Sequence, residues 1–266
     1  MNLGLIQMNV IDNKESNLVK AEVFIEEAVS KGANVILLPE MFNCPYDNSY
    51  FETYAEADGG PTYKRLASWA KKYGVILFAG SVPELEGENL YNTAYVFDQK
   101  GDLIGKHRKT HLFDIDVKDK IRFMESEVLS AGDSTTVVDT AYGKIGICIC
   151  YDIRFPEFAR KMVLEGAQVI LVPGAFNMTT GPAHWQLTAR ARALDNQVYY
   201  GLCSPARDES ALYTAYGYSV VTNPWGEVIS ELDEKEGVLV QEIDFQSQEL
   251  IREELPLLKH RKPGCY

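Results

Sequence analysis

The sequence is poor in cysteine and in basic residues, and it lacks long apolar runs. Its five cysteines are scattered over 266 residues, an odd number that argues against a secreted disulfide framework and favours a reducing cytoplasm. Lysine and arginine total 26 against 38 acidic residues, so the net charge is −12 and the surface repels nucleic acid and anionic lipid. No apolar stretch reaches the roughly 18 residues of a membrane-spanning helix, and the first residues lack the basic start of a signal peptide. We therefore expect a cytoplasmic protein with neither nucleic acid nor membrane as a partner.

Several motifs of phosphate-binding, dinucleotide-binding and metal-dependent proteins are also missing. The chain contains no G-x-x-x-x-G-K-[ST] phosphate loop, no G-x-G-x-x-G fingerprint and no G-x-S-x-G elbow, which excludes P-loop, Rossmann and serine-elbow chemistry. Cys148 and Cys150 form a C-x-C pair, but no second pair follows to complete a zinc site. His107 and His111 have two basic residues between them, and their charge opposes a bound cation. The residues therefore argue against a metal site, and Cys148 is better interpreted as a core residue.

Hydrophobic patterning predicts alternating strands and helices over the whole chain. Val35 to Leu38 form a continuous apolar run, which is typical of a strand buried on both faces. The expected helices cover residues 14–31, 63–73, 155–165, 184–196 and 246–255. The expected strands cover residues 3–9, 35–38, 75–79, 91–98, 103–108, 144–149, 169–172, 198–203, 218–222, 227–231 and 238–243. No linker interrupts this alternation, so we expect one α/β domain over residues 1–266, with two sheets and helices outside them.

Two chemically capable side chains follow directly after predicted strands. Glu40 comes after the strand at residues 35–38, and Cys150 comes after the strand at residues 144–149. Ligands of open α/β folds gather outside the carboxyl ends of strands, so these two residues are well placed to share a site. Each also has a plain structural interpretation. The carboxylate of Glu40 could cap a helix or pair with a cation, and Cys150 could be an inert buried thiol.

The residues around Cys150 favour a reactive thiol. Pro156 and Glu157 both suit the first turn of a helix, so the sequence predicts a strand-to-helix elbow at the cysteine. The positive end of that helix would favour thiolate over thiol. His111 and His184 are candidate bases for a cysteine–histidine hydrolase, and the sequence does not exclude that either one folds next to Cys150.

Three segments together resemble the motifs of the nitrilase superfamily of carbon-nitrogen hydrolases, in the family's order. They are Leu37-Leu38-Pro39-Glu40, the stretch His107 to Phe113, and the stretch Gly146 to Glu157. The likeness runs from Gly4 to about Leu258, nearly the whole chain. Further stretches are similar to the omega-amidase branch, namely residues 41–46, 112–117, 173–185, 195–199, 204–208 and 223–227.

The resemblance implies a fold, an assembly and an activity. The expected fold is an α/β four-layer αββα sandwich of the nitrilase type, assembled through its outer helices into a homodimer or larger homo-oligomer. The expected enzyme is a thiol-dependent amidase that needs no cofactor and no metal. Its expected substrates are small-molecule amides, the short dicarboxylic acid monoamides such as 2-oxoglutaramate and 2-oxosuccinamate, which it would convert to the dicarboxylate and ammonia.

The resemblance also implies a role for individual residues. Cys150 would be the nucleophile, Glu40 the general base, and Lys109 the cation beside the oxyanion. The backbone N–H of Tyr151 would be the second oxyanion donor. Glu125 matches a further family glutamate that helps to position the substrate and Lys109.

The residues that bind the distal part of the substrate are less well defined. Arg154 is common across the superfamily, so we expect it to make a structural pair rather than to recognise substrate. Tyr46, Phe113 and Phe176 flank family motifs and are candidate pocket residues, although all could equally belong to the core. Two alternatives stay open: the same chemistry on deaminated glutathione, an N-carbamoyl amine or a nitrile, and a non-catalytic scaffold that keeps the fold for partner binding.

Overall fold

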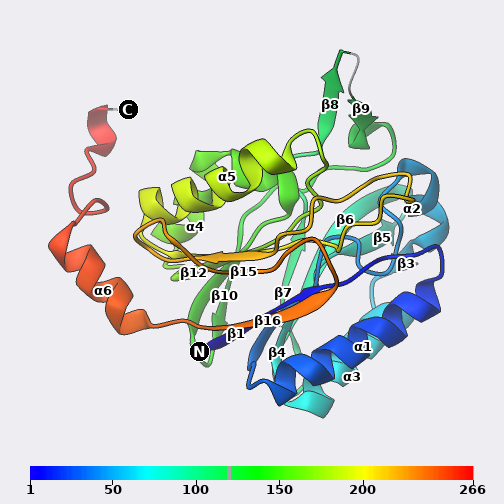
Figure 1. Cartoon of the computed structure of the whole chain (residues 1–266), viewed down its shortest axis with the longest axis horizontal. Coiled ribbons are helices and arrows are strands. Elements are labelled where there is room, and N and C mark those ends of the chain that lie inside the picture. The colour runs from blue at the N-terminus through cyan, green and yellow to red at the C-terminus, as the bar shows by residue number, and fades with distance from the viewer. Residues whose placement is uncertain (119–120, 266) are drawn as a thin grey trace.

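Two β-sheets lie face to face between pairs of helices in the computed structural model, which describes residues 1–118 and 121–265 (Figure 1). Helices α4 and α5 cover the outer face of one sheet, and α1 and α3 cover the outer face of the other. The α-helices of the described residues are α1 (Lys14–Ser30), α2 (Asn48–Tyr54), α3 (Pro61–Tyr73), α4 (Pro156–Leu164), α5 (Gly181–Asn196) and α6 (Phe245–Glu254). The same described residues form the short 3-10 helices η1 (Glu125–Glu127), η2 (Cys150–Arg154) and η3 (Pro263–Cys265).

The first sheet has three parallel strands at its centre, which are flanked on both sides by antiparallel pairs. Its order is β16 (Gly237–Glu242), β1 (Asn2–Gln7), β2 (Val35–Leu37), β4 (Ile76–Phe78), β6 (Asn89–Phe97), β5 (Val82–Glu86) and β3 (Glu56–Ala57), with β7 (Leu103–Arg108) also paired to β6. Strands β1, β2 and β4 run parallel, so their carboxyl ends meet at one edge.

The second sheet repeats this plan with parallel strands in its middle. Its order is β10 (Thr136–Thr140), β11 (Gly143–Ile147), β12 (Val169–Pro173), β13 (Tyr199–Cys203), β14 (Val220–Thr222) and β15 (Val228–Glu231). Strands β11, β12 and β13 run parallel. A separate hairpin of β8 (Asp114–Val117) and β9 (Ile121–Met124) projects from the body (Figure 1).

Alternation along the central strands of the first sheet places successive side chains in two different apolar clusters. Leu5 and Leu37 face the opposite sheet and belong to the cluster between the sheets. Ile6 and Ile36, one residue away on the same strands, face α1 and α3 instead. The two sheets pack so closely that a Cβ added at Gly201 would lie 2.8 Å from a methyl carbon of Leu3. Both faces of β2 are therefore buried, as its apolar run predicts.

Local sequence signals set where the helices begin and end. The Asn13 side chain accepts a hydrogen bond from the Ser16 backbone N–H and caps α1. Pro61 stands in the first turn of α3, where a missing N–H costs nothing. Gly74 ends α3 in the left-handed conformation at φ +64°, which a residue with a Cβ rarely adopts.

The predicted α/β class, the four-layer sandwich and the two main sheets are confirmed. All five expected helices and all eleven expected strands exist, with bounds that differ by at most three residues. Helix α5 begins at Gly181 rather than His184, since Pro182 fits its first turn. The sequence pattern missed α2, β3, β5, β8, β9 and β10, which are short or lie within polar stretches. No helix among the residues that the structure describes is long and apolar enough to cross a membrane.

Candidate active site

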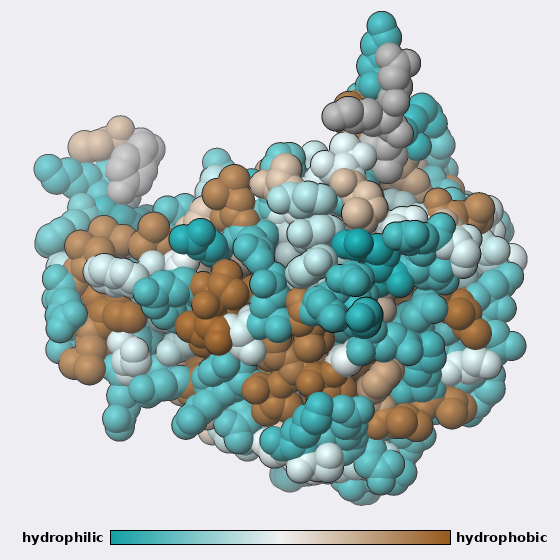
Figure 2. Space-filling model, in the orientation of Figure 1, coloured by the Kyte–Doolittle hydropathy of each residue, from teal (hydrophilic) through white to brown (hydrophobic). Residues whose placement is uncertain are grey.

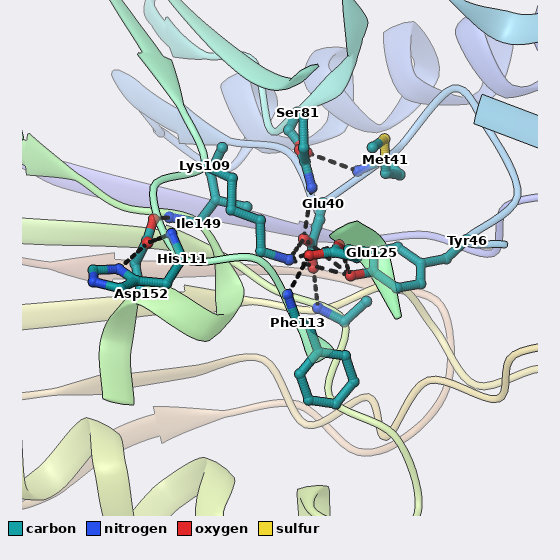
Figure 3. Close-up of polar contacts among 12 residues, drawn as sticks. Glu40, Met41, Tyr46, Ser81, Lys109, His111, Phe113, Glu125, Ile149 and Asp152 are labelled. Atoms are coloured by element: carbon teal, nitrogen blue, oxygen red, sulfur yellow. Dashed lines mark hydrogen bonds and ion pairs between the residues drawn. The ribbon is translucent and has the colours of Figure 1, made fainter. Parts of the chain in front are cut away.

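Three strand ends bring Glu40, Lys109 and Cys150 together in the interior. Figure 3 shows the contact between Glu40 and Lys109. Glu40 follows β2, Lys109 follows β7, and Cys150 opens η2 after β11. All three are buried, with exposed fractions of 0%, 1% and 3%. The convergence of side chains far apart in the sequence, which the motifs predict, is therefore present in the fold.

The Glu40 carboxylate is held by donors from three different segments. Lys109 Nζ lies 3.0 Å from Glu40 Oε1, and the Asn92 Nδ2 amide donates to the same oxygen at 2.9 Å. The backbone N–H of Ala175 donates to Oε2 at 2.8 Å. Burial raises the pKa of Glu40 above its ordinary value, and the Lys109 ammonium and the Cys150 thiol only partly offset this. The carboxylate is thus fixed in place and more basic than an exposed glutamate.

A second buried carboxylate holds the Lys109 ammonium from the other side. Lys109 Nζ donates to Glu125 Oε1 at 2.8 Å, and the Tyr46 hydroxyl donates to the same oxygen at 2.6 Å. The Phe113 backbone N–H donates to Glu125 Oε2 at 2.6 Å. Burial lowers the pKa of Lys109, but the carboxylates of Glu125 and Glu40 outweigh it and hold that pKa above the ordinary lysine value. Lys109 is therefore a fixed positive charge.

Cys150 occupies a strained turn, and its surroundings favour the thiol over the thiolate. Its backbone φ of +46° is rare for a residue with a side chain. Burial raises the pKa of the Cys150 thiol well above its usual range, and the Glu40 carboxylate raises it further. The expectation that a helix end favours the thiolate is wrong, because α4 begins only at Pro156 and η2 is too short to offset desolvation.

The expected oxyanion donors come from two segments, the turn itself and the residue that follows β7. Tyr151 is the second residue of η2, where the first backbone N–H groups have no partner within the helix. Its ring packs edge-on against Phe113 with 5.3 Å between centroids. Lys109 Nζ is fixed by the two carboxylates described above. The structure thus provides one ammonium and one free helix-start N–H near the thiol.

The two candidate histidine bases have other partners. His111 Nδ1 contacts Asp152 Oδ1 at 2.7 Å, and its ring stacks on Phe155 with 3.7 Å between centroids. His184 Nδ1 lies 3.1 Å from an Arg154 guanidinium nitrogen. Among the described groups, the carboxylate that hydrogen-bonds with the Cys150 thiol is that of Glu40. The geometry favours a cysteine–glutamate site over a cysteine–histidine one.

The three aromatic candidates have different surroundings. The Tyr46 hydroxyl bonds Glu125 and lies 3.2 Å from Lys109 Nζ, so this residue belongs to the polar cluster. Phe113 contributes its backbone N–H to Glu125, and its ring is in the apolar wall beside Tyr151. The Phe176 ring is buried, and its centroid lies 4.9 Å from that of the Trp185 ring. None of the three is exposed on the surface.

Sequence reasoning missed three groups that complete this site. Asn92 is a polar residue inside a predicted strand, and that position was a usable signal for a hydrogen-bonding role, which its burial confirms. The Ala175 backbone N–H carries no signal in the sequence. Tyr213 comes from the long connection between β13 and β14; its hydroxyl donates to the Ala175 carbonyl at 2.6 Å, and its ring lies 4.7 Å from that of Tyr46.

A cavity of about 280 Å³ reaches the carboxylate cluster. It opens where β1, β2 and β13 end, and its inner wall includes Glu40, Tyr46, Ala175 and Tyr213. A volume of this size fits a small ligand rather than a polymer. In the part of the chain that the structure describes, no group of three or more histidine, cysteine or acidic side chains is arranged to hold a metal ion.

A four-layer sandwich with a buried thiol, carboxylate and ammonium at its strand ends is the architecture of the nitrilase superfamily. The model of the carbon-nitrogen hydrolase family matches residues 2–253. The chain belongs to this family, and the resemblance that the sequence motifs indicate is confirmed.

Individual relatives are similar over nearly their whole length. Omega-amidase NIT2-A of Xenopus laevis is 52% identical over 264 residues, covering 99% of this chain and 96% of the relative. Nit3 from Saccharomyces cerevisiae is 41% identical in sequence, and its crystal structure matches with a TM-score of 0.91 over 98% of this chain and 96% of Nit3. A mutant amidase from Nesterenkonia sp. AN1 is 25% identical, with a TM-score of 0.81 over 100% of this chain and 95% of the amidase. Its structure shows covalent addition of the acetamide moiety of fluoroacetamide at the active-site cysteine.

Proposed function

We propose that this chain is an omega-amidase that hydrolyses the terminal amide of short dicarboxylic acid monoamides such as 2-oxoglutaramate and 2-oxosuccinamate. The products are the dicarboxylate and ammonia. One observation carries the proposal: a buried ammonium, Lys109, is fixed between Glu40 and Glu125 beside the Cys150 thiol. The name of the Xenopus relative supports the choice of substrate class.

Acylation begins with the protonated thiol. Glu40, whose pKa burial raises, takes the proton from Cys150 as the sulfur attacks the amide carbon. The oxyanion that develops is stabilised by the Lys109 ammonium and the Tyr151 backbone N–H. Removing one donor of this kind typically costs about 100-fold in rate or more. Protonated Glu40 then gives its proton to the departing nitrogen, the C–N bond breaks, and ammonia leaves a thioester on Cys150.

Deacylation uses the same groups in reverse. Glu40 takes a proton from water, and the resulting hydroxide attacks the thioester carbon. The Lys109 ammonium and the Tyr151 N–H stabilise the second oxyanion. The C–S bond then breaks, the product leaves as a carboxylic acid that loses its proton to water, and the Cys150 sulfur takes back the proton from Glu40. In both half-reactions Glu125 orients Lys109 by accepting the 2.8 Å hydrogen bond from its Nζ.

Arg154 is the cation best placed to bind the distal carboxylate. Its guanidinium is partly buried, lies 4.6 Å from the Phe176 ring, and interacts electrostatically with the Cys150 thiol. Burial lowers its pKa. Its Nε is a buried donor without a hydrogen-bond partner, and no carboxylate of the described residues pairs with it. Arg154 therefore pairs structurally with His184, but no carboxylate of the described residues pairs with it, and a substrate carboxylate would complete its hydrogen bonds.

The variant Arg154→Met tests this assignment. Methionine keeps apolar contact with Phe176 but removes the charge. Losing a charge-assisted hydrogen bond of about 1.5–3 kcal/mol predicts a 10- to 100-fold lower kcat/KM for 2-oxoglutaramate. Butyramide, a neutral amide of similar length, serves as the internal control and should change by less than about threefold. Equal losses on both substrates would show that Arg154 acts on the fold and not on the carboxylate.

A substrate panel tests the proposed activity against its alternatives. Steady-state kcat/KM is measured for 2-oxoglutaramate, deaminated glutathione, an N-carbamoyl amine and a nitrile. We expect 2-oxoglutaramate to exceed each of the others by at least about tenfold, since one good polar contact can supply that selectivity. A clear preference for one of the other compounds would reassign the substrate while leaving the chemistry intact.

We further propose that residues 1–266 form a single catalytic domain that works as a homodimer or larger homo-oligomer. The two sheets share one core, which supports a single domain. Exposed apolar residues on the outer helices support association, among them Leu187 on α5 and Leu250 on α6 at 63% and 58% exposed. Figure 2 shows apolar surface over α6, at the end of the molecule from which the C-terminal segment extends.

The cysteines support the proposal of a reducing compartment such as the cytoplasm. All five are free thiols, and four of them are buried. The half-reactions above need only the side chains named and water, so we propose that the enzyme requires no cofactor and no metal.

A further inference from the structure

Asp152, two residues after Cys150, accepts hydrogen bonds from two motifs at once (Figure 3). Its Oδ1 takes the His111 backbone N–H at 2.9 Å and lies 2.7 Å from His111 Nδ1. Its Oδ2 takes the Ile149 backbone N–H at 2.9 Å and lies 3.2 Å from His107 Nε2. The proposed mechanism does not use this carboxylate, although it lies between the segments that carry Lys109 and Cys150.

The carboxylate is buried and ionised. Asp152 has no exposed surface. Burial raises its pKa, but the hydrogen bonds from His107 and His111 outweigh this and lower the pKa to about 2. Each oxygen has two donors, so the negative charge is fully compensated by hydrogen bonds. A buried anion bound in this way has little freedom to move.

The donors flank Lys109 on both sides. His107 is two residues before Lys109, and His111 is two residues after it. The Lys109 backbone N–H itself donates to the Asn92 carbonyl at 2.9 Å, which anchors the segment to β6. Asp152 therefore fixes both ends of a five-residue stretch whose middle residue carries the ammonium.

The same carboxylate closes the turn that contains Cys150. Asp152 Oδ2 accepts from the Ile149 N–H, and the Asp152 backbone N–H donates to the Ile149 carbonyl at 3.0 Å. These two bonds enclose Cys150, whose φ of +46° needs support from its surroundings. One side chain thus sets both the turn of the thiol and the segment of the ammonium.

We propose that Asp152 is a positioning residue that fixes the Lys109 ammonium relative to the Cys150 sulfur, and that His107 and His111 serve as hydrogen-bond donors to it and not as acids or bases. The inference rests on the proposed function, since positioning matters only if these two groups act on one substrate. A displacement of about 1 Å in such a pair costs on the order of 100-fold in rate.

The variant Asp152→Asn replaces one carboxylate oxygen with an amide NH2 group. This group cannot accept a hydrogen bond, so it faces an N–H donor that has lost its acceptor. We expect kcat to fall about 100-fold while KM stays within about threefold, because alignment and not binding is lost. Glu56→Gln is the matched control: Glu56 is a carboxylate remote from the site that accepts from Lys14 and from Thr62. It should lower the melting temperature without lowering kcat.

Paired histidine variants separate hydrogen bonding from proton transfer. Asparagine places an amide nitrogen near the position of histidine Nδ1, and glutamine places one near Nε2. His111→Asn and His107→Gln should keep kcat within about fivefold of wild type, whereas His111→Ala and His107→Leu should lose about tenfold or more. If His111→Asn is as inactive as His111→Ala, the imidazole acts in proton transfer and the inference is wrong.

The rate of Cys150 alkylation by iodoacetamide, followed by peptide mass spectrometry, provides a readout independent of turnover. We expect Asp152→Asn to slow it at least about tenfold, since the sulfur and its proton acceptor lose their alignment. Wild-type kcat and alkylation in a folded Asp152→Asn variant would overturn the positioning role. Failure of the proposed function is distinguishable, because it would show as a wild-type enzyme without amidase activity whose Cys150 alkylation still responds to Asp152.

Discussion

Replacing Cys150 with alanine is expected to lower kcat for ammonia release from 2-oxoglutaramate by at least about 10⁴-fold. The thiol forms the covalent bond in both half-reactions, and no other described cysteine interacts with both Glu40 and Lys109. Water would have to attack the amide directly, and an amide is a poor electrophile. The fold should survive, because the change removes one sulfur atom from a turn held by backbone and Asp152 hydrogen bonds.

Cys148→Ala is the matched control for this experiment. Cys148 lies two residues earlier, is equally buried, and burial raises its thiol pKa well above the usual range. Its side chain belongs to the buried apolar core. The variant should keep kcat within about threefold while losing about 1 kcal/mol of stability for the lost packing. Retained activity in Cys150→Ala would refute the covalent mechanism.

Lys109→Met is expected to lower kcat by about 10³-fold and to destabilise the fold. The variant removes an oxyanion donor, which accounts for most of the loss in rate. It also leaves Glu40 and Glu125 buried without their shared cation. Breaking such a pair lowers the stability of the fold by about 3–5 kcal/mol, and protonation of one of the two carboxylates reduces this loss. Ammonia release and thermal unfolding measure the two effects separately.

The pH profile of this variant tests the coupling between Lys109 and Glu40. Glu40 must be ionised to accept the thiol proton, so kcat/KM rises as pH increases through its pKa. Burial already raises that pKa, and the Lys109 ammonium opposes the rise. Without the ammonium the pKa increases, so the acid limb of kcat/KM should move to higher pH. An acid limb that stays in place would show that Glu40 is not the base.

Lys106→Met is a suitable control for both measurements. Lys106 lies on β7 three residues before Lys109 and pairs with Asp58 and Glu84 at a partly exposed position. A pair at such a site contributes about 1 kcal/mol or less. We expect the acid limb of kcat/KM for the Lys106→Met variant to lie at the same pH as in the wild-type enzyme. Its kcat should change by less than about threefold.

The sequence was sufficient to predict the layers of the fold because burial imposes a local pattern. The run Val35 to Leu38 is apolar at every position, since one face of β2 meets the other sheet and the other face meets helices. Gly74 and Pro61 mark the ends of α3 for local conformational reasons. Glu40, Lys109 and Cys150 were identifiable because each ends a strand and belongs to a short motif.

The ionisation state of the site was not predictable in this way. Proximity to a helix suggests an ionised Cys150, but the sign of the shift depends on desolvation and on Glu40, which is 110 residues away in sequence. The position of Tyr213 is set by a long connection without a regular pattern. The surroundings of Arg154 show the same limit, because only tertiary structure reveals that it has no carboxylate partner.

The central claim, that Cys150 is the nucleophile and Glu40 receives its proton, is tested most directly by labelling with fluoroacetamide. The sulfur displaces fluoride, and the acetamide group stays on the protein. Peptide mass spectrometry should find one acetamide group on Cys150, with amidase activity falling in proportion to the labelled fraction and labelling slowed in Glu40→Gln. Full inactivation with Cys150 unmodified, or full activity with Cys150 labelled, would contradict the account.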